Sequence, residues 1–294
     1  MKNTSFAKLA LKVAVFYFSV AGVCQTVQAQ SEIRFRLVRD TLIVASMTAG
    51  NQGPFDFVLD TGADTTIVDS ALAAKLSLVP LGQVQQTTVA GVQAISLSTL
   101  PSLAAGSAHV ENLRVLVRDL AEVRKMDSHI VGIAGQDFLS HFNYLIDYWR
   151  HTVRIEEGTE IQDTIGGEPV TMEANGNRMI IPSEAQGAGH ASLRLLVDSG
   201  ANSLLLVGTA PQALNLPLQG HGVENTSSGQ ATLQLARVHE LTVGSAELHD
   251  IPVAVSANGP KQIGDGLLPT VLFQAVYINN QQHFVVFNPH GKRK

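Results

Sequence analysis

A seven-residue phrase occurs twice in this chain, and its repetition constrains the fold more than any other feature. VLDTGAD at 58–64 returns as LVDSGAN at 196–202, so the second aspartate follows the first at an offset of 198 − 60 = 138. The same offset aligns GSAHVENLRVLV at 106–117 with GSAELHDIPVAV at 244–255 without a gap. A match at one fixed spacing over so much of the chain predicts two copies of one structural plan.

The repeat divides the chain into two lobes joined by a short connection. The aligned blocks place the first lobe at 37–155 and the second at 168–288. The stretch between them, 156–167, belongs to a polar segment with a Gly pair and a Pro, which is typical of a linker. Residues 289–294 then form a C-terminal tail.

The local hydrophobic pattern in each lobe is that of short strands. Alternation is clear in TLIVASM, NLRVLV, TLQLARV and IPVAV, and Gly, Asn and Pro separate such runs. Helical pattern is limited to short stretches at 70–76, 136–142 and 209–216. We therefore expect an all-β protein with few and short helices.

The N-terminal segment, 1–29, has the pattern of a secretory signal peptide. Three lysines precede an uncharged apolar run at 13–23, and Val27 and Ala29 offer small side chains at a cleavage site. A membrane span needs ~20 apolar residues, so this run is too short for an anchor. Val23 before Cys24 is a poor fit to lipoprotein processing. We expect an exported protein, periplasmic or secreted, with no stable membrane insertion after cleavage.

Composition excludes several classes of function for the exported chain. Cys24 is the only cysteine and lies in the signal segment, so the remainder has no disulfide, thiolate zinc site or cysteine nucleophile. Loss of three lysines moves the formal net charge from −5 to −8 (−5 − 3), and an acidic surface without a basic run argues against nucleic acid binding. The histidines form no HExxH motif and the glycines no phosphate loop. We expect no metal and no cofactor.

The repeated phrase resembles the active-site motif of aspartic proteases. In each copy Asp-[Thr/Ser]-Gly-Ala follows an apolar run, and a glycine-bearing hairpin segment comes later. An apolar-apolar-Gly segment then follows, at 130–132 in the first copy and less clearly at 264–267 in the second. The chain is most similar to retropepsin-like aspartyl proteases of exported bacterial type, with both lobes fused. This resemblance implies a bilobed acid-protease fold with two β-barrel-like lobes and a cleft between them.

The chemistry of this family explains why one chain needs the phrase twice. Peptide hydrolysis without a metal or a covalent nucleophile needs an activated water and a protonated carbonyl. Two adjacent carboxyl groups that share one proton can supply both. The resemblance implies that Asp60 and Asp198 form this catalytic pair, and that the substrate is an extended peptide or a flexible protein segment. Because both halves are present in one chain, a monomer should suffice.

Six residues are expected to support the two aspartate loops. By resemblance, the hydroxyls at the second motif position would bond across the lobe interface, with local turn capping as the alternative. The glycines at the third position would let the loops approach closely, and the alanines at the fourth would support the loops and line the cleft. These residues are Thr61, Gly62, Ala63, Ser199, Gly200 and Ala201.

Four further positions are expected to contact substrate. Asp64 matches a family position that hydrogen-bonds the substrate backbone, with a surface turn residue as the alternative, and Asn202 holds the paired position. Gly91 and Gly229 lie in two candidate flap hairpins, TTVAGVQA and TSSGQAT, which would close over the substrate. Neither hairpin contains the tyrosine of a pepsin-like flap, so the comparison with retropepsins is the better one.

The second lobe departs from the family pattern in one supporting element. Gln136-Asp137 of the first lobe is replaced there by Thr270-Val271. Asp137 and Asp265 are interpreted as turn or surface carboxylates.

Two alternatives to an aspartic endopeptidase remain open. A binding module of the same fold would hold a peptide or an envelope component without cutting it. A purely structural β protein would depend on neither aspartate for activity or binding. Both aspartates are intact, which favours the enzyme.

Overall fold

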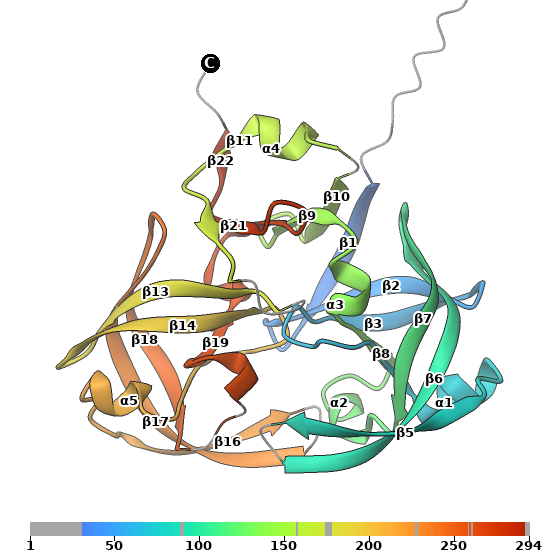
Figure 1. The fold of residues 1–294 in the computed structure, drawn as a ribbon, viewed down its shortest axis with the longest axis horizontal. Coiled ribbons are helices and arrows are strands. Elements are labelled where there is room, and N and C mark those ends of the chain that lie inside the picture. The colour runs from blue at the N-terminus through green and yellow to red at the C-terminus, as the bar shows by residue number, and fades with distance from the viewer. Residues whose placement is uncertain are drawn as a thin grey trace, which may run out of the picture.

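The computed structural model describes residues 31–88, 91–156, 158–173, 178–226, 229–257, 259 and 261–291. The predicted signal segment and the last three residues of the tail lie outside these ranges. Strands dominate the described chain and all of its helices are short (Figure 1). The expected all-β class is confirmed.

Each lobe contains seven strands that are connected in the same way. In the first lobe they are β2 (Leu42–Ala49), β3 (Gln52–Leu59), β4 (Ile67–Asp69), β5 (Pro80–Thr88), β6 (Gly91–Ala105), β7 (Ala108–Arg118) and β8 (Ile130–Ala134). In the second lobe they are β13 (Ile180–Gln186), β14 (His190–Asp198), β15 (Leu204–Val207), β16 (Gly220–Thr226), β17 (Gly229–Val243), β18 (Ala246–Ser256) and β19 (Gly266–Pro269).

The order of strands across the two sheets demonstrates the duplication. The first lobe has the order β2-β3-β8-β4-β7-β6-β5, and the second has β13-β14-β19-β15-β18-β17-β16. β2 also pairs with β6, and β13 with β17, so each lobe curls back on itself as a barrel-like sheet. The turn between the two long strands of each lobe uses a glycine at the same repeat position, Gly106 with φ 58° and Gly244 with φ 56°. Glycine adopts this left-handed conformation without steric cost.

A third set of strands joins the lobes, and we call it the shared sheet. Its members are β1 (Ser31–Val38), β9 (Asn143–Asp147), β10 (Thr152–Glu156), β12 (Val170–Thr171), β20 (Ala275–Asn279) and β21 (Phe284–Phe287). Their order is β12-β21-β20-β9-β10-β1, so each half of the chain supplies three neighbouring strands. A small pair, β11 (Ile165–Gly166) with β22 (His290–Gly291), lies beside it. In Figure 1 the shared sheet lies at the top centre, above the first lobe on the right and the second on the left.

The described helices are short and mark the ends of strands. They are α1 (Ser70–Lys75), α2 (Ala121–Arg124), α3 (Gln136–Leu139), α4 (Glu160–Thr164), α5 (Ala210–Ala213) and the 3₁₀ turns η1 (Lys261–Ile263) and η2 (Thr270–Leu272). Each of the three predicted helical stretches contains one of them, α1, α3 or α5, whereas α4 lies in the segment predicted as a linker. Within the described ranges, no helix has the length and apolar character needed to cross a membrane.

The hydrophobic core is continuous from one lobe to the other through the shared sheet. Alternation along β9 explains this, because Tyr144 and Ile146 belong to the large cluster that includes both lobes. Leu145 faces the opposite side, where it packs with Ile161 of α4 and with Tyr277. Both faces of the shared sheet are therefore covered, and the sheet fixes the two lobes relative to each other.

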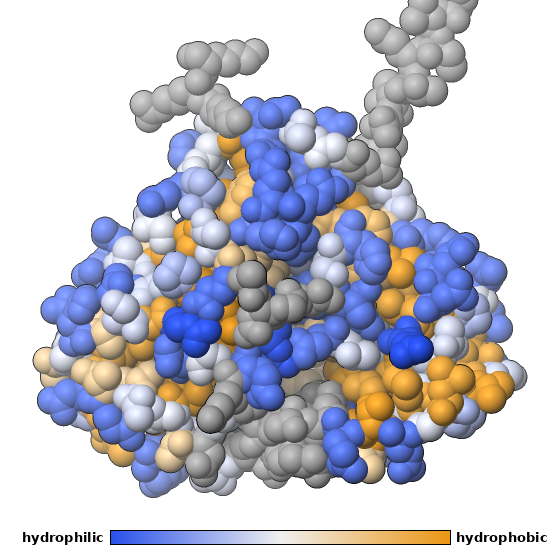
Figure 2. Space-filling view, viewed as in Figure 1, coloured by the Kyte–Doolittle hydropathy of each residue, from blue (hydrophilic) through white to orange (hydrophobic). Residues whose placement is uncertain are grey.

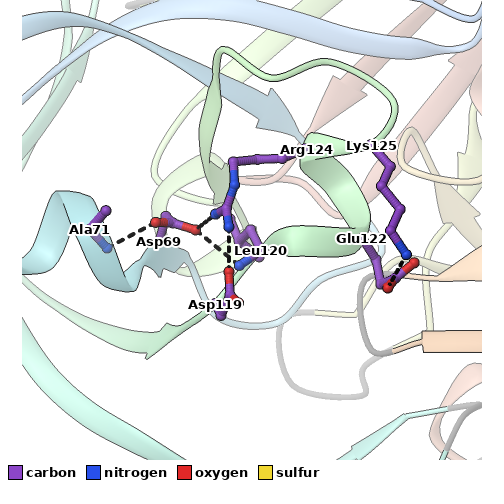
Figure 3. Close-up of polar contacts among 7 residues, drawn as sticks. All are labelled: Asp69, Ala71, Asp119, Leu120, Glu122, Arg124 and Lys125. Carbon is purple, nitrogen blue, oxygen red and sulfur yellow. Dashed lines mark hydrogen bonds and ion pairs between the residues drawn. The ribbon is translucent and has the colours of Figure 1, made fainter.

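A buried aspartate in the first lobe holds α2 against α1. Asp69 is 2% exposed, and its carboxylate accepts hydrogen bonds from Ala71 N and Leu120 N, both at 2.9 Å (Figure 3). Arg124 pairs with Asp69 and also with Asp119 at 2.5 Å. Since α2 contacts β16 of the second lobe, this network fixes one place where the lobes meet.

Exposed apolar side chains gather at the edge strand β5. Val79 precedes this strand and is 72% exposed, and Leu81 within it is 58% exposed. Figure 2 shows apolar surface at the lower right, where β5 and α1 lie in Figure 1. The predicted first flap hairpin therefore begins on an apolar outer surface.

The start of α4 is held by a buried carboxylate of the shared sheet. Glu156 is 5% exposed and accepts hydrogen bonds from Ile161 N and from Gln162 N at 3.0 Å. It also accepts one from the Tyr277 hydroxyl at 2.6 Å. One side chain thus ties the connection between the lobes to strands of both halves.

Glu156→Gln should lower the free energy of unfolding by about 1–3 kcal/mol, because a neutral amide cannot accept all three hydrogen bonds in this buried site. Urea unfolding followed by circular dichroism would measure the change. Glu111→Gln, on an exposed position of β7, is the matched control and should stay within about 0.5 kcal/mol of the parent. Equal effects of the two substitutions would contradict the assigned role of Glu156.

Candidate active site

Each repeated aspartate stands at the end of a buried strand. β3 leads into Asp60 and lies parallel to β8, and Asp60 N donates to Ala134 O at 2.9 Å. β14 ends at Asp198 and lies parallel to β19, with Asp198 in register with Pro269. The apolar residues before each aspartate are buried and anchor its loop, so the same local sequence produces the same local structure twice.

The two loops meet with no room for a side chain at either glycine. A Cβ atom at Gly62 would lie within 3.0 Å of the Asp198 carboxyl, and one at Gly200 would lie within 3.0 Å of the Asp60 carboxyl. Each carboxyl therefore contacts the opposite loop. The fold brings Asp60 and Asp198 together from opposite lobes, although they are far apart in the chain.

Side-chain hydroxyls cross between the loops. Thr61 Oγ1 donates to Val197 O at 2.9 Å and accepts from Ser199 N at 2.9 Å. Ser199 Oγ donates to Leu59 O at 2.8 Å and accepts from Thr61 N at 3.0 Å. Both residues are 1% exposed. These four hydrogen bonds link the lobes, whereas local turn capping would have stayed within one loop.

Backbone N–H groups fix the rotation of each carboxyl. In both loops, Oδ1 of the aspartate accepts hydrogen bonds from the residues two and three positions later. The donors are Gly62 N (2.9 Å) and Ala63 N (3.1 Å) for Asp60, and Gly200 N (2.7 Å) and Ala201 N (3.0 Å) for Asp198.

The electrostatic environment differs between the two carboxyls. Asp198 is 7% exposed, whereas Asp60 is half-buried. Burial raises the pKa of Asp60, and the hydrogen bonds from its own loop oppose that rise. Burial raises the pKa of Asp198 well above its usual range, and the charge of Asp60 raises it further. Two carboxyls in this position titrate as a pair and hold one proton between them over a range of pH.

The first loop is supported by two neighbouring side chains, those of Gln136 and Asp137. Gln136 is fully buried, and its Nε2 donates to Thr61 O at 3.1 Å. Asp137 accepts hydrogen bonds from Thr66 N at 2.9 Å and from the Thr66 hydroxyl at 2.6 Å. The interpretation of Asp137 as a turn or surface carboxylate is therefore wrong, since it braces the segment after Asp60. One feature of the sequence points to this role, because Gln136-Asp137 is the dipeptide that the second lobe replaces by Thr270-Val271.

At the aligned position of the second lobe, a different pair of side chains meets. Thr270 is fully buried, and its hydroxyl lies 2.5 Å from the Tyr148 hydroxyl. Tyr148 comes from the first half of the chain, and no local pattern marks it for this position. Asp265 accepts a hydrogen bond from Arg194 N at 2.8 Å at an exposed site, in agreement with its interpretation as a turn carboxylate.

The positions after the two loops are not equivalent. Asp64 is exposed and forms an ion pair with Arg178, which precedes the first strand of the second lobe. Asn202 holds the paired position and is also exposed. The sequence offered no sign of Arg178, because the ion pair depends on how the lobes meet.

The two predicted flap segments form hairpins. Gly91 begins β6 and pairs with Thr88, and Gly229 begins β17 and pairs with Thr226. The residues between these pairs, 89–90 and 227–228, lie outside the described ranges. The closing motion expected of these hairpins stays a prediction.

Comparison with known protein families shows the family to which this chain belongs. A family profile described as aspartyl protease matches residues 45–138 and 183–270. The chain belongs to the aspartyl protease family. The starts of the matched segments, 45 and 183, have the same offset as the repeat, and each segment contains one of the two aspartates of this aspartyl protease. A comparison with curated proteins finds no match.

Thr61→Val should destabilise this aspartyl protease by about 2–4 kcal/mol, because it removes two buried cross-lobe hydrogen bonds and leaves their backbone partners unpaired. Thr61→Ser is the matched control, since serine performs the same role at position 199, and it should stay close to the parent. Urea unfolding measures both. A Val variant as stable as the Ser variant would mean that these hydroxyls do not hold the lobes together.

Asp198→Asn should stabilise the folded chain increasingly as the pH rises from 4 towards 8. A carboxyl with a raised folded pKa binds more protons folded than unfolded, so its contribution to stability falls as the pH rises through that pKa. Asparagine carries no such loss, and each unit of raised pKa corresponds to ~1.4 kcal/mol at high pH. Unfolding at several pH values measures the difference from the parent.

Asp40→Asn, at an exposed position, is the control for this titration experiment. Its effect on stability should change little with pH. A difference between Asp198→Asn and the parent that is the same at pH 4 and pH 8 would contradict the assigned environment of Asp198.

Proposed function

We propose that this member of the aspartyl protease family is an endopeptidase that hydrolyses extended peptides or flexible protein segments with Asp60 and Asp198. The observation that carries the proposal is the meeting of two Asp-[Thr/Ser]-Gly loops, each with its carboxyl against the glycine of the other. A structural protein has no need for two half-buried or buried acids at one interface, since their proximity disfavours ionisation.

In the proposed mechanism, a water molecule binds between the two carboxyls and the substrate carbonyl lies beside it. Asp198, the more buried acid, holds the shared proton, and Asp60 is ionised. Asp60 takes a proton from the water as its oxygen attacks the carbonyl carbon, and Asp198 gives its proton to the carbonyl oxygen. Asp60 then returns a proton to the leaving nitrogen as the C–N bond breaks, while Asp198 recovers its proton from the hydroxyl of the intermediate.

The remaining site residues have supporting roles in this proposal. Thr61 and Ser199 keep the two carboxyls at a fixed separation, which lets a single water contact both. We assign Asp64 and Asn202 to hydrogen bonds with the substrate backbone. The hairpins that contain Gly91 and Gly229 would close over the substrate and pair with it as an added strand does.

The proposal needs neither a cofactor nor a second copy of the chain. One chain supplies both aspartates, so we expect a monomer to be active. The described residues hold no group of three or more His, Cys, Asp or Glu side chains that could bind a metal ion. The signal-like pattern of segment 1–29 supports export to the periplasm or the medium.

Digestion of a peptide library by the purified protein between pH 3 and pH 7, with products identified by mass spectrometry, tests the proposal. Asp60→Asn and Asp198→Asn should each reduce the rate by roughly 10²–10⁴-fold or more, since each removes one half of the proton transfer. Asp40→Asn, at an exposed position, should cleave as the parent does. Sedimentation of the active sample should show a monomer.

A folded parent that cleaves nothing but binds peptides saturably would replace the enzyme with the binding module that the sequence also allows. Cleavage that persists in both Asn variants would remove the dyad from the mechanism. Activity confined to a dimer would require contributions from a second copy.

A further inference from the structure

The aligned segments beside the two aspartate loops differ at the position that contacts the first loop. In the first lobe, Gln136 reaches the loop directly through its hydrogen bond to Thr61 O. In the second lobe that position holds Thr270, whose side chain is shorter. Its hydroxyl pairs instead with the hydroxyl of Tyr148. A residue that follows β9 of the shared sheet thus contacts the segment that runs beside the second loop.

Tyr148 is held firmly in this position. It follows β9, and its backbone N–H donates to Gln274 O at 2.9 Å. Its ring packs edge-on against Phe35, with the ring centroids 6.0 Å apart and the planes at 73°. The side chain is nearly buried, at 9% exposure. Both the backbone and the ring therefore direct the hydroxyl to Thr270.

The two hydroxyls lie beside the more buried acid of the dyad. Strand register pairs Asp198 with Pro269, and Thr270 is the next residue. Burial raises the pKa of Tyr148, and the charge of nearby Asp198 raises it further, so the phenol is neutral at ordinary pH. As a neutral group, the phenol can act on Asp198 only as a dipole, through the hydroxyl pair that it forms with Thr270.

We propose that Tyr148 is a positioning residue of the dyad, which acts through Thr270 to set the placement and ionisation of Asp198. The inference rests on the proposed function, because it assumes that Asp198 takes part in proton transfer. Two hydroxyl dipoles near a buried carboxyl favour its ionised form relative to an apolar wall. They provide for the second lobe what Gln136 and Asp137 provide for the first.

Other charged groups act on the dyad, and they do not substitute for Tyr148. Asp60 is the partner carboxyl and raises the pKa of Asp198. Asp64, in its ion pair with Arg178, raises the pKa of Asp60 from the first lobe. Tyr148, which follows β9 of the shared sheet, is a further ionisable side chain near Asp198.

Tyr148→Phe tests the inference, because it keeps the ring and removes the hydroxyl. The alkaline limb of the kcat/KM profile, where the dyad loses its second proton, should move up by about half a pH unit or more. The accompanying loss of rate should appear in kcat more than in KM, since Tyr148 does not contact the substrate. Tyr277→Phe is the matched control: it removes a buried hydroxyl bonded to Glu156 at 2.6 Å and should lower stability without moving the profile.

Thr270 provides a second and independent arm. Thr270→Val should shift the pH profile as Tyr148→Phe does. The double variant should shift it no further, because both substitutions remove the same contact between the two hydroxyls. Thr270→Ser retains the hydroxyl and should restore the parent profile. If Tyr148→Phe fails to fold, the comparison of Thr270→Val with Thr270→Ser still decides the question.

A titration that needs no activity separates this inference from the proposed function. In protein labelled with ¹³C at the aspartate carboxyl, the Asp198 signal is identified by its absence in Asp198→Asn. Its midpoint should rise in Tyr148→Phe and stay unchanged in Tyr277→Phe. A parent that cleaves no peptide would end the proposed function and leave this measurement valid. An unmoved midpoint and an unmoved profile in folded Tyr148→Phe would reduce Tyr148 to a packing residue.

Discussion

Two carboxyl groups held against each other with little water are an unfavourable arrangement, and the fold around Asp60 and Asp198 is organised to maintain it. The carboxyls would separate if the loops could relax. The crossed hydrogen bonds of Thr61 and Ser199 prevent this, because each hydroxyl bonds the backbone of the opposite loop. In the proposed mechanism, burial makes it favourable for the two carboxyls to share one proton. The proposed chemistry therefore depends on the rigidity of the contact between the lobes.

That rigidity comes from the way the two halves of the chain are joined. Two barrel-like lobes connected only by a linker would be free to move apart. Instead each half contributes three strands to the shared sheet, and β9 pairs directly with β20. The core runs through this sheet, and Ile161 and Tyr277 cover its other face. The loops are thus fixed on one side by the shared sheet and at their tips by the crossed hydrogen bonds.

The repeat carried most of what could be predicted from the sequence. One constant offset between the two halves is enough to predict two equivalent lobes, and local alternation is enough to predict strands. The shared sheet could not be predicted, because β9 and β20 are far apart in the chain and neither has a marked pattern. The supporting role of Asp137 could not be predicted for a related reason, because its partner Thr66 lies far from it in the sequence, just before β4. The Arg178 ion pair and the Tyr148 contact likewise arise only when the two halves are assembled.

The lobes repeat a topology but not a set of contacts, and this difference makes two chemically identical acids distinguishable. In a perfectly symmetric pair, neither carboxyl would hold the proton preferentially. Here the first loop is supported by the amide of Gln136, whereas the second has a hydroxyl pair and a more buried acid. Fusion of the two halves in one chain permits this divergence, because each copy can change by itself. A dimer of identical chains would have to change both loops at once, whereas the fused chain can give its two aspartates different environments.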